Sequence, residues 1–197
     1  RNSMKAREVR IPAALVDVVV IDESQRQGYE LVYDAAVSGE RFTYDLEEQT
    51  VQFSPRLVIA KRARQELVDD AVINFGFGIP DQVAKLIERD GISDRYYQTI
   101  EHGTYGGRLM DGDLFGYAMN PNCMIDGPSQ FDFYSGGGLD IAFLGFGEID
   151  AAGNVNVSKL AGNTVGPGGF IDIAQNANTV VFCGTFDTDG TRLKIGQ

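Results

Sequence analysis

Residues 71–107 read AVINFGFGIPDQVAKLIERDGISDRYYQTIEHGTYGG and carry the clearest signal of the fold class. The short apolar run at 71–75 is typical of a buried strand. A helical pattern follows over 80–91, with proline in its first turn and glycine after its last. A second apolar run, 96–100, then ends directly on Glu101. The order strand, helix, strand predicts two parallel strands joined by a helical crossover.

The same alternation continues on both sides of this stretch. Upstream, Ser54-Pro55 predicts a helix start, because serine is a good N-cap and proline suits the first helical position. Downstream, short β-prone runs predict further strands at 141–145, 154–158 and 179–183. The pattern therefore predicts an α/β domain with an open, mainly parallel sheet flanked by helices.

The N-terminal part of the chain differs in character. Residues 9–22, VRIPAALVDVVVID, are strongly β-prone and predict one or two strands. Residues 23–50 are polar and loop-like. We therefore expect residues 1–50 to be an arm or linker from a preceding domain and residues 51–197 to form the α/β domain.

The composition restricts the function. The net charge of −11 argues against a nucleic-acid-binding or anionic-membrane surface, either of which would require a basic patch. No apolar run is long enough to span a bilayer. Cys123 and Cys183 fit no metal-ligand spacing, and we expect two buried, reduced thiols. One histidine without suitably spaced carboxylates does not build a metal site, so we expect neither a metal nor a redox cofactor.

Glycine is abundant and clusters where strands are predicted to end. In open α/β sheets ligands bind at the carboxyl ends of the strands, and glycine lets the backbone approach a ligand closely. We therefore expect four clusters to meet at that edge beside Glu101 and to offer backbone amides to a substrate. Their candidate binding residues are Gly76, Gly78, Gly106, Gly107, Gly136, Gly137 and Gly138, with Gly168 and Gly169 in the fourth cluster.

Glu101 is the candidate reactive group, as a nucleophile or as a general acid or base. Other chemistries have less support, because the chain has no GxSxG motif and NFGFGIPDQ lacks the third glycine of a dinucleotide fingerprint. A structural role for Glu101, capping a loop or pairing with Arg108, remains open. His102 is interpreted as a loop residue that orients its neighbours. Phe75 is expected in the core, whereas Phe77 could line an acyl pocket.

Six ordered stretches carry a resemblance to a known family. They are NFGFGIPDQVA (74–84), TIEHGTYGG (99–107), FGYAMNP (115–121), QFDFYSGGGLDIAFLG (130–145), GNVNVSK (153–159) and GPGGFIDIAQNA (166–177). Together they resemble the C-terminal half of family I CoA-transferases, close to the acetate/propionate type.

This resemblance implies a reaction and a set of residues. Glu101 would be the nucleophile and would carry CoA as a glutamyl-CoA thioester in a ping-pong transfer between short-chain acyl-CoA and a carboxylic acid. The Gly169 N–H would bind the oxyanion, with Gly168 as the neighbouring candidate. CoA would be a substrate, and no cofactor is implied.

The resemblance also implies partners. An N-terminal half, in the same chain or in a separate subunit, would supply the rest of the CoA site and a second oxyanion donor. The assembly would be a homo-oligomer in the cytoplasm, or in the mitochondrial matrix of a eukaryote. Residues 193–197 read as an interrupted strand, so we expect a fragment or a subunit that lacks activity when isolated.

Two other functions remain open at the level of sequence. One is a non-catalytic binding or assembly module of the same fold. The other is a related acyl-CoA hydrolase, in which water rather than a carboxylate attacks. The choice between transferase and hydrolase depends on how well the closed site excludes water, which sequence does not specify.

Overall fold

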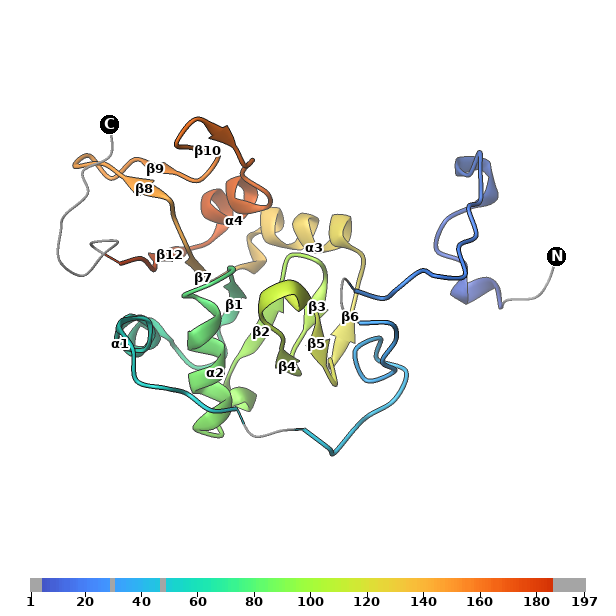
Figure 1. Ribbon diagram of the computed structural model, residues 1–197, viewed down its shortest axis with the longest axis horizontal. Coiled ribbons are helices and arrows are strands. Elements are labelled where there is room, and N and C mark those ends of the chain that lie inside the picture. Colours follow the sequence, from blue (N-terminus) through green and yellow to red (C-terminus); the bar gives the residue numbers. More distant parts are fainter. Residues whose placement is uncertain (1–4, 29–30, 47–48, 186–197) are drawn as a thin grey trace.

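The computed structural model of the chain describes residues 5–28, 31–46 and 49–185 (Figure 1). Residues 193–197, predicted as an interrupted strand, lie outside these ranges. The centre of the molecule is a six-stranded sheet. Its strands, in spatial order, are β12 (Thr179–Phe182), β7 (Ile141–Leu144), β1 (Val72–Phe75), β2 (Tyr97–Ile100), β3 (Thr104–Tyr105) and β6 (Cys123–Met124).

The sheet is parallel in its centre and antiparallel at one edge. Strand β1 pairs in parallel with β2 and β7, and β7 pairs in parallel with β12. Strands β3 and β6 add an antiparallel edge beyond β2. The predicted open, mainly parallel α/β sheet is therefore confirmed. Separate two-stranded ribbons are β4 (Arg108–Leu109) with β5 (Ala118–Met119), β8 (Glu148–Ile149) with β9 (Val155–Asn156), and β10 (Lys159–Leu160) with β11 (Asn163–Thr164).

Helices cover both faces of this sheet (Figure 1). Helices α1 (Pro55–Ala63) and α2 (Asp81–Arg89) cover one face, whereas α3 (Gly127–Phe133), the π-helical turn η6 (Tyr134–Gly138) and α4 (Phe170–Asn176) cover the other. Successive strand residues point to opposite faces, so Phe143 joins the core under α1 and α2 while Ala142 and Leu144 join the core under η6 and α4. Short 3-10 helices are η1 (Ala6–Glu8), η2 (Ala13–Leu15), η3 (Arg64–Glu66), η4 (Ser93–Arg95) and η5 (Gly112–Leu114).

The local signals in the sequence account for most of these elements. Helix α1 begins as predicted, because the Ser54 side chain accepts a hydrogen bond of 3.2 Å from the Leu57 N–H. The predicted helix at 80–91 and the predicted strands at 71–75 and 96–100 are confirmed within one or two residues. Phe75 is fully buried and stacks on Phe143 with ring centroids 5.7 Å apart, as expected for a core residue.

The strand prediction for residues 9–22 is wrong. This segment contains the short helix η2 and is otherwise extended, and it projects away from the sheet (Figure 1). The side chains of residues 18–21 are 75–87% exposed. A β-prone sequence becomes a strand only when another strand offers its backbone groups, and among the described residues none lies beside this one.

Residues 31–46 lie against the β4–β5 ribbon. The Asn120 N–H donates to the Ala36 carbonyl at 2.9 Å, and its side-chain amide donates to the Thr43 carbonyl at 2.8 Å. Ala36 and Val37 are almost completely buried by this contact. Within the described ranges of the chain, no helix has the length and apolar character needed to cross a bilayer.

Candidate functional site

Glu101 lies at the carboxyl end of β2 and is half-buried. It follows Thr99 by two residues, so both side chains are expected on the same face of the sheet, under α3. On the adjacent strand, Asn74 pairs with Thr99, and its Nδ2 donates a hydrogen bond of 3.1 Å to Oε2 of Glu101. A buried amide from β1 therefore holds the carboxylate at the end of β2.

Tyr134, at the start of η6, lies next to this pair. Its hydroxyl is 2.6 Å from Thr99 Oγ1 and 3.3 Å from Asn74 Nδ2. Thr99 Oγ1 in turn donates to the Ile73 carbonyl at 2.7 Å. Burial and, to a smaller extent, the Glu101 charge raise the pKa of Tyr134 to about 12, although its hydrogen-bonding neighbours act in the opposite direction. The tyrosine is therefore neutral at physiological pH.

Asn74, Thr99 and Tyr134 were not predicted from the sequence. All three side chains are buried in the structure. A signal was present, because Asn74 and Thr99 are polar residues inside strands that are otherwise mostly apolar. Buried polar side chains are retained where they have hydrogen-bond partners, and here the partners converge on Glu101.

Gly169 comes from a distant part of the sequence and lies beside Glu101. A Cβ on Gly169 would lie 3.3 Å from Glu101 Cγ and 3.0 Å from the ring of Phe131. Gly169 is the N-cap residue of α4, and its N–H has no hydrogen-bond acceptor among the described residues. Gly168 precedes it with φ = +56°, a conformation that favours glycine. The structure thus brings Glu101 and Gly169 together.

Gly76 and Gly78 also lie at the carboxyl edge of the sheet, just after β1. The Gly76 N–H donates to the Phe143 carbonyl at 2.8 Å, and a Cβ on Gly76 would lie 3.0 Å from the same oxygen. Gly78 has φ = +92° and open space around it. Gly76 therefore allows β1 to pack closely on β7. No atom crowds Gly78, so its position at this edge of the sheet is open.

The expectation that Gly106 and Gly107 line the same edge is wrong. The chain reverses direction at Gly103, so β3 runs back along β2, and the Gly106 N–H bonds the Gln98 carbonyl at 2.8 Å. A Cβ on Gly106 would lie 2.3 Å from the Asn122 side chain, and one on Gly107 would lie 2.4 Å from the Met119 carbonyl. These glycines allow neighbouring backbone to pack closely.

The expectation for Gly136, Gly137 and Gly138 is wrong in the same respect. They end η6 and lead into β7 at its amino end, which is the opposite edge of the sheet from Glu101. Gly137 has φ = +91°, and a Cβ on Gly138 would lie 2.4 Å from the Phe133 ring. Their role is to turn the chain from helix to strand.

The residues beside Glu101 in the sequence have other contacts. Arg108 pairs with Glu88 of α2, with Nε and Oε1 2.5 Å apart. The exposed His102 ring lies against Phe115, with centroids 6.3 Å apart, and against Gly116, where a Cβ would lie 2.7 Å from its Nδ1. His102 thus packs within its loop. Phe77 is 62% exposed and packs on Phe115.

The two cysteines differ. Cys183 is buried, as expected, and burial raises the pKa of its thiol to about 11. Cys123 is exposed, so the expectation of a buried thiol is wrong there, because the edge strand β6 carries it. In the described parts of the chain, no three His, Cys, Asp or Glu side chains lie together as a metal site would require.

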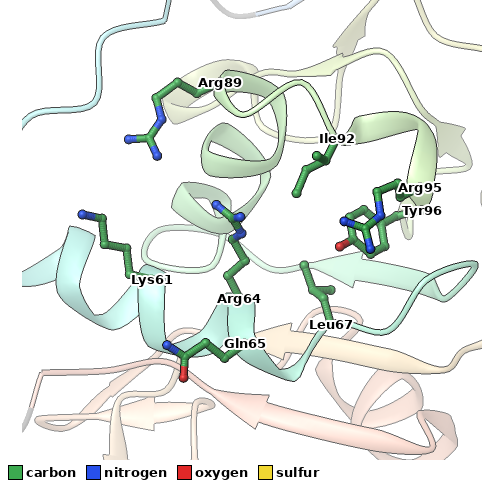
Figure 2. A pocket seen from close by; sticks show the side chains of 8 residues that line it. All are labelled: Lys61, Arg64, Gln65, Leu67, Arg89, Ile92, Arg95 and Tyr96. Carbon is green, nitrogen blue, oxygen red and sulfur yellow. The ribbon is translucent and has the colours of Figure 1, made fainter.

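A basic groove of about 500 Å³ lies away from Glu101 (Figure 2). It lies between the α1–η3 segment and the α2–η4 segment, next to residues that precede β1 and β2, hence at the amino edge of the sheet. Its arginines are largely neutralised, because Arg64 and Arg89 pair with Asp90 and Arg95 pairs with Asp69. Its lining is Lys61, Arg64, Gln65, Leu67, Arg89, Ile92, Arg95 and Tyr96.

Comparison with known proteins shows what the chain resembles. It is 38% identical to acetate CoA-transferase YdiF of Escherichia coli O157:H7, over the whole chain and 37% of that protein. It is 37% identical to the caffeate CoA-transferase of Acetobacterium woodii, over 95% of the chain and 37% of that protein. The homologues of this chain are CoA-transferases. The chain spans little more than a third of the length of these relatives. No family model matches it.

Two further comparisons agree with this homology. The crystal structure of the E. coli O157:H7 acyl-CoA transferase YdiF, in a thioester complex with CoA, superposes with a TM-score of 0.79 at 38% identity, over 94% of the chain and 34% of that structure. One subunit of a probable succinyl-CoA:3-ketoacid coenzyme A transferase of Bacillus subtilis is 30% identical over 62% of each chain. The homology to CoA-transferases thus extends to the three-dimensional structure.

Proposed function

We propose that this chain carries the catalytic glutamate of an enzyme that transfers CoA between a short-chain acyl-CoA and a carboxylic acid. The observation that carries the proposal is that Gly169 lies beside Glu101. A carboxylate at a strand end lies against a glycine whose N–H has no acceptor among the described residues. The homology to acetate CoA-transferase gives this pair its chemistry.

The first half of the reaction moves CoA onto the enzyme. A Glu101 oxygen attacks the thioester carbonyl carbon of the acyl-CoA, the C–S bond breaks, and CoA leaves as a thiolate. The product is an acyl-glutamyl anhydride. The thiolate then attacks Cδ of Glu101, the bond from Cδ to the bridging oxygen breaks, and the acyl group leaves as a carboxylate. Glutamyl-CoA remains, and the thioester free energy is conserved.

The second half repeats these steps in reverse with a different acid. The incoming carboxylate attacks Cδ of glutamyl-CoA and displaces the thiolate, which then attacks the acyl carbon of the new anhydride. The new acyl-CoA leaves and Glu101 is again a free carboxylate. In every step one anionic group, a carboxylate or the CoA thiolate, attacks and another leaves, so no step requires a proton or a redox cofactor. The kinetics are ping-pong, because the first product leaves before the second acid binds.

Each step passes through a tetrahedral oxyanion. We assign two hydrogen-bond donors to these oxyanions. The Gly169 N–H serves the oxyanion that forms on the acyl carbon, with Gly168 shaping the turn before it. Asn74 Nδ2 already donates to one oxygen of Glu101 and so serves the oxyanions that form on Cδ. A preorganised donor of this kind typically contributes about 3–4 kcal/mol to transition-state stabilisation.

The rest of the proposed enzyme lies outside this chain. Residues 51–197 would be the catalytic α/β domain and residues 1–50 the arm that joins it to a preceding part. That part, in the same polypeptide or in a separate subunit, would complete the CoA site. We further propose a homo-oligomer in the cytoplasm or, in a eukaryote, the mitochondrial matrix. The Bacillus subtilis relative, itself one subunit of a transferase, supports division into two chains.

The test is to trap the glutamyl intermediate. The complete enzyme is incubated with acetyl-CoA and its peptides are mapped by mass spectrometry, before and after borohydride reduction. We expect a CoA adduct on Glu101 and a reduced product there after borohydride. E101Q should lose the adduct and the transferase activity, whereas E66Q, at the opposite edge of the sheet, should keep both.

Two results would overturn the proposal. One is an adduct that never appears on Glu101 while CoA transfer proceeds. The other is full activity in E101Q. If acetyl-CoA is hydrolysed as fast without an acceptor acid as CoA is transferred with one, the enzyme is a hydrolase instead.

A further inference from the structure

The hydrogen bonds behind Glu101 have a fixed direction. The chain of contacts runs from the Ile73 carbonyl through Thr99 and Tyr134 to Asn74 and then to Glu101. Thr99, Tyr134 and Asn74 are buried, so water does not substitute for a missing partner. Each hydroxyl has one hydrogen to donate, so the number of available hydrogens determines which atom donates in each hydrogen bond of the network.

The network begins at the Ile73 main-chain carbonyl, which can only accept a hydrogen bond. Thr99 therefore uses its one hydrogen to donate to the Ile73 carbonyl at 2.7 Å. The 2.6 Å contact between Thr99 and Tyr134 then requires the Tyr134 hydroxyl to be the donor. The Tyr134 oxygen then has no hydrogen left and can only accept from its other neighbour, Asn74.

This direction decides which end of the Asn74 amide points toward the nucleophile. Tyr134 accepts only from Nδ2, and a Glu101 carboxylate also accepts only from Nδ2. If the Asn74 amide were rotated by 180°, its Oδ1 would face two acceptors, the Tyr134 oxygen and the Glu101 carboxylate. In the observed orientation Oδ1 is buried without a hydrogen-bond partner, so no contact of Oδ1 itself favours this orientation. The preference comes from Tyr134 and Glu101.

We propose that Tyr134 is a positioning residue for the nucleophile, acting through Asn74 to keep an N–H donor directed at Glu101. This inference rests on the proposed function of Glu101. Thr99 is the second member of the relay, because its bond to the Ile73 carbonyl orients the Tyr134 hydroxyl. Gln130 is also buried, and neither of its amide atoms has a hydrogen-bond partner among the described residues, so it is not a member of the relay.

The first test is Y134F in the complete enzyme. Phenylalanine keeps the ring that fills the core and removes only the hydroxyl. We expect kcat for CoA transfer to fall about tenfold, with KM for acetyl-CoA within about twofold, because the lost contact orients the nucleophile and does not bind substrate. The matched control is Y117F, which removes a hydroxyl that donates to the Gln27 carbonyl at 2.7 Å, in the arm.

Substitutions of Thr99 give a second test that changes fewer atoms. T99S keeps the hydroxyl and should retain wild-type kcat, whereas T99V has a similar shape without the hydroxyl and should behave as Y134F does. The double variant Y134F/T99V should be no slower than either single variant, because both changes interrupt one relay. In an N74A background Y134F should have little further effect.

Crystal structures of the variants give a readout that does not depend on activity. In Y134F we expect the Asn74 amide to turn over or Glu101 to move, so that the Nδ2–Oε2 contact of 3.1 Å is lost. In Y117F that contact should persist. If Y134F fails to fold in a thermal unfolding assay, the T99V and T99S pair decides the question by the same two measurements.

The outcomes separate this inference from the proposed function. If the wild-type enzyme forms an adduct on Glu101 and Y134F and T99V match Y117F in kcat, the inference is overturned. If no adduct forms in the wild type, the proposed function has failed. The crystal structures then decide alone, and an unchanged Asn74–Glu101 contact in Y134F and T99V overturns the relay.

Discussion

At the scale of single residues, the site depends on where a few polar and small side chains sit relative to Glu101. Asn74 provides the donor, and Gly169 provides an N–H and the absence of a side chain. The neighbours of Glu101 in the sequence matter less. His102 packs within its loop, and Gly106 and Gly107 allow close backbone packing. Proximity in sequence is therefore a poor guide to function in this loop.

Gly169 provides a prediction at this scale. In G169A the new Cβ would meet Phe131 at 3.0 Å and Glu101 Cγ at 3.3 Å, so the nucleophile or the loop must shift. We expect kcat to fall about 100-fold or more, because a misplaced oxyanion donor loses most of its effect. Steady-state kinetics of CoA transfer measure this.

The control for this prediction is G136A. A Cβ on Gly136 would meet no heavy atom within 4 Å, and its φ is not positive. We expect activity within about twofold of wild type. Equal loss of activity in both variants would contradict the special position of Gly169.

At the scale of elements, the strands and helices fix which residues meet. The parallel pairing of β1 with β2 sets Asn74 opposite Thr99, and α3 with η6 carries Tyr134 over both. Helix α4 begins at the point where Gly169 reaches Glu101. On the other face, α1 and α2 pack on the same strands.

The cap of α1 provides a prediction about stability. S54A removes the side-chain acceptor for the Leu57 N–H and should lower the free energy of unfolding by about 1 kcal/mol. Urea denaturation followed by circular dichroism measures the change. S54D keeps a capping acceptor and should retain most of the free energy of unfolding that S54A loses. A loss of the same size in S54D would show that the cap is not the cause.

At the scale of the whole molecule, we propose that the chain supplies one wall of a larger site. It spans 37% of the acetate CoA-transferase to which it is 38% identical. Residues 18–21 present apolar side chains that are 75–87% exposed. Such a run is costly in water unless another surface covers it. Both observations support a larger assembly.

The isolated chain provides the prediction at this scale. We expect the purified 197-residue chain to lack transferase activity and to gain it when the remaining part of the enzyme is added. The physical reason is that, in the proposed enzyme, that part supplies a second oxyanion donor and further contacts with CoA. The assay is CoA transfer from acetyl-CoA to propionate, with E101Q as the blank. Full activity of the isolated chain would refute this division of the site.

The α/β architecture, most central elements and the candidate nucleophile could be predicted from the amino-acid sequence. These depend on local signals, such as the Ser54-Pro55 helix start, the apolar strand at 71–75 and a carboxylate directly after a strand. The folded chain was needed to show which glycine lies beside Glu101 and which glycines merely allow packing. It also showed that Asn74, Thr99 and Tyr134 lie behind the carboxylate. Contacts between distant segments depend on strand order and register, and the β-prone run at 9–22 shows that propensity without a partner forms no strand.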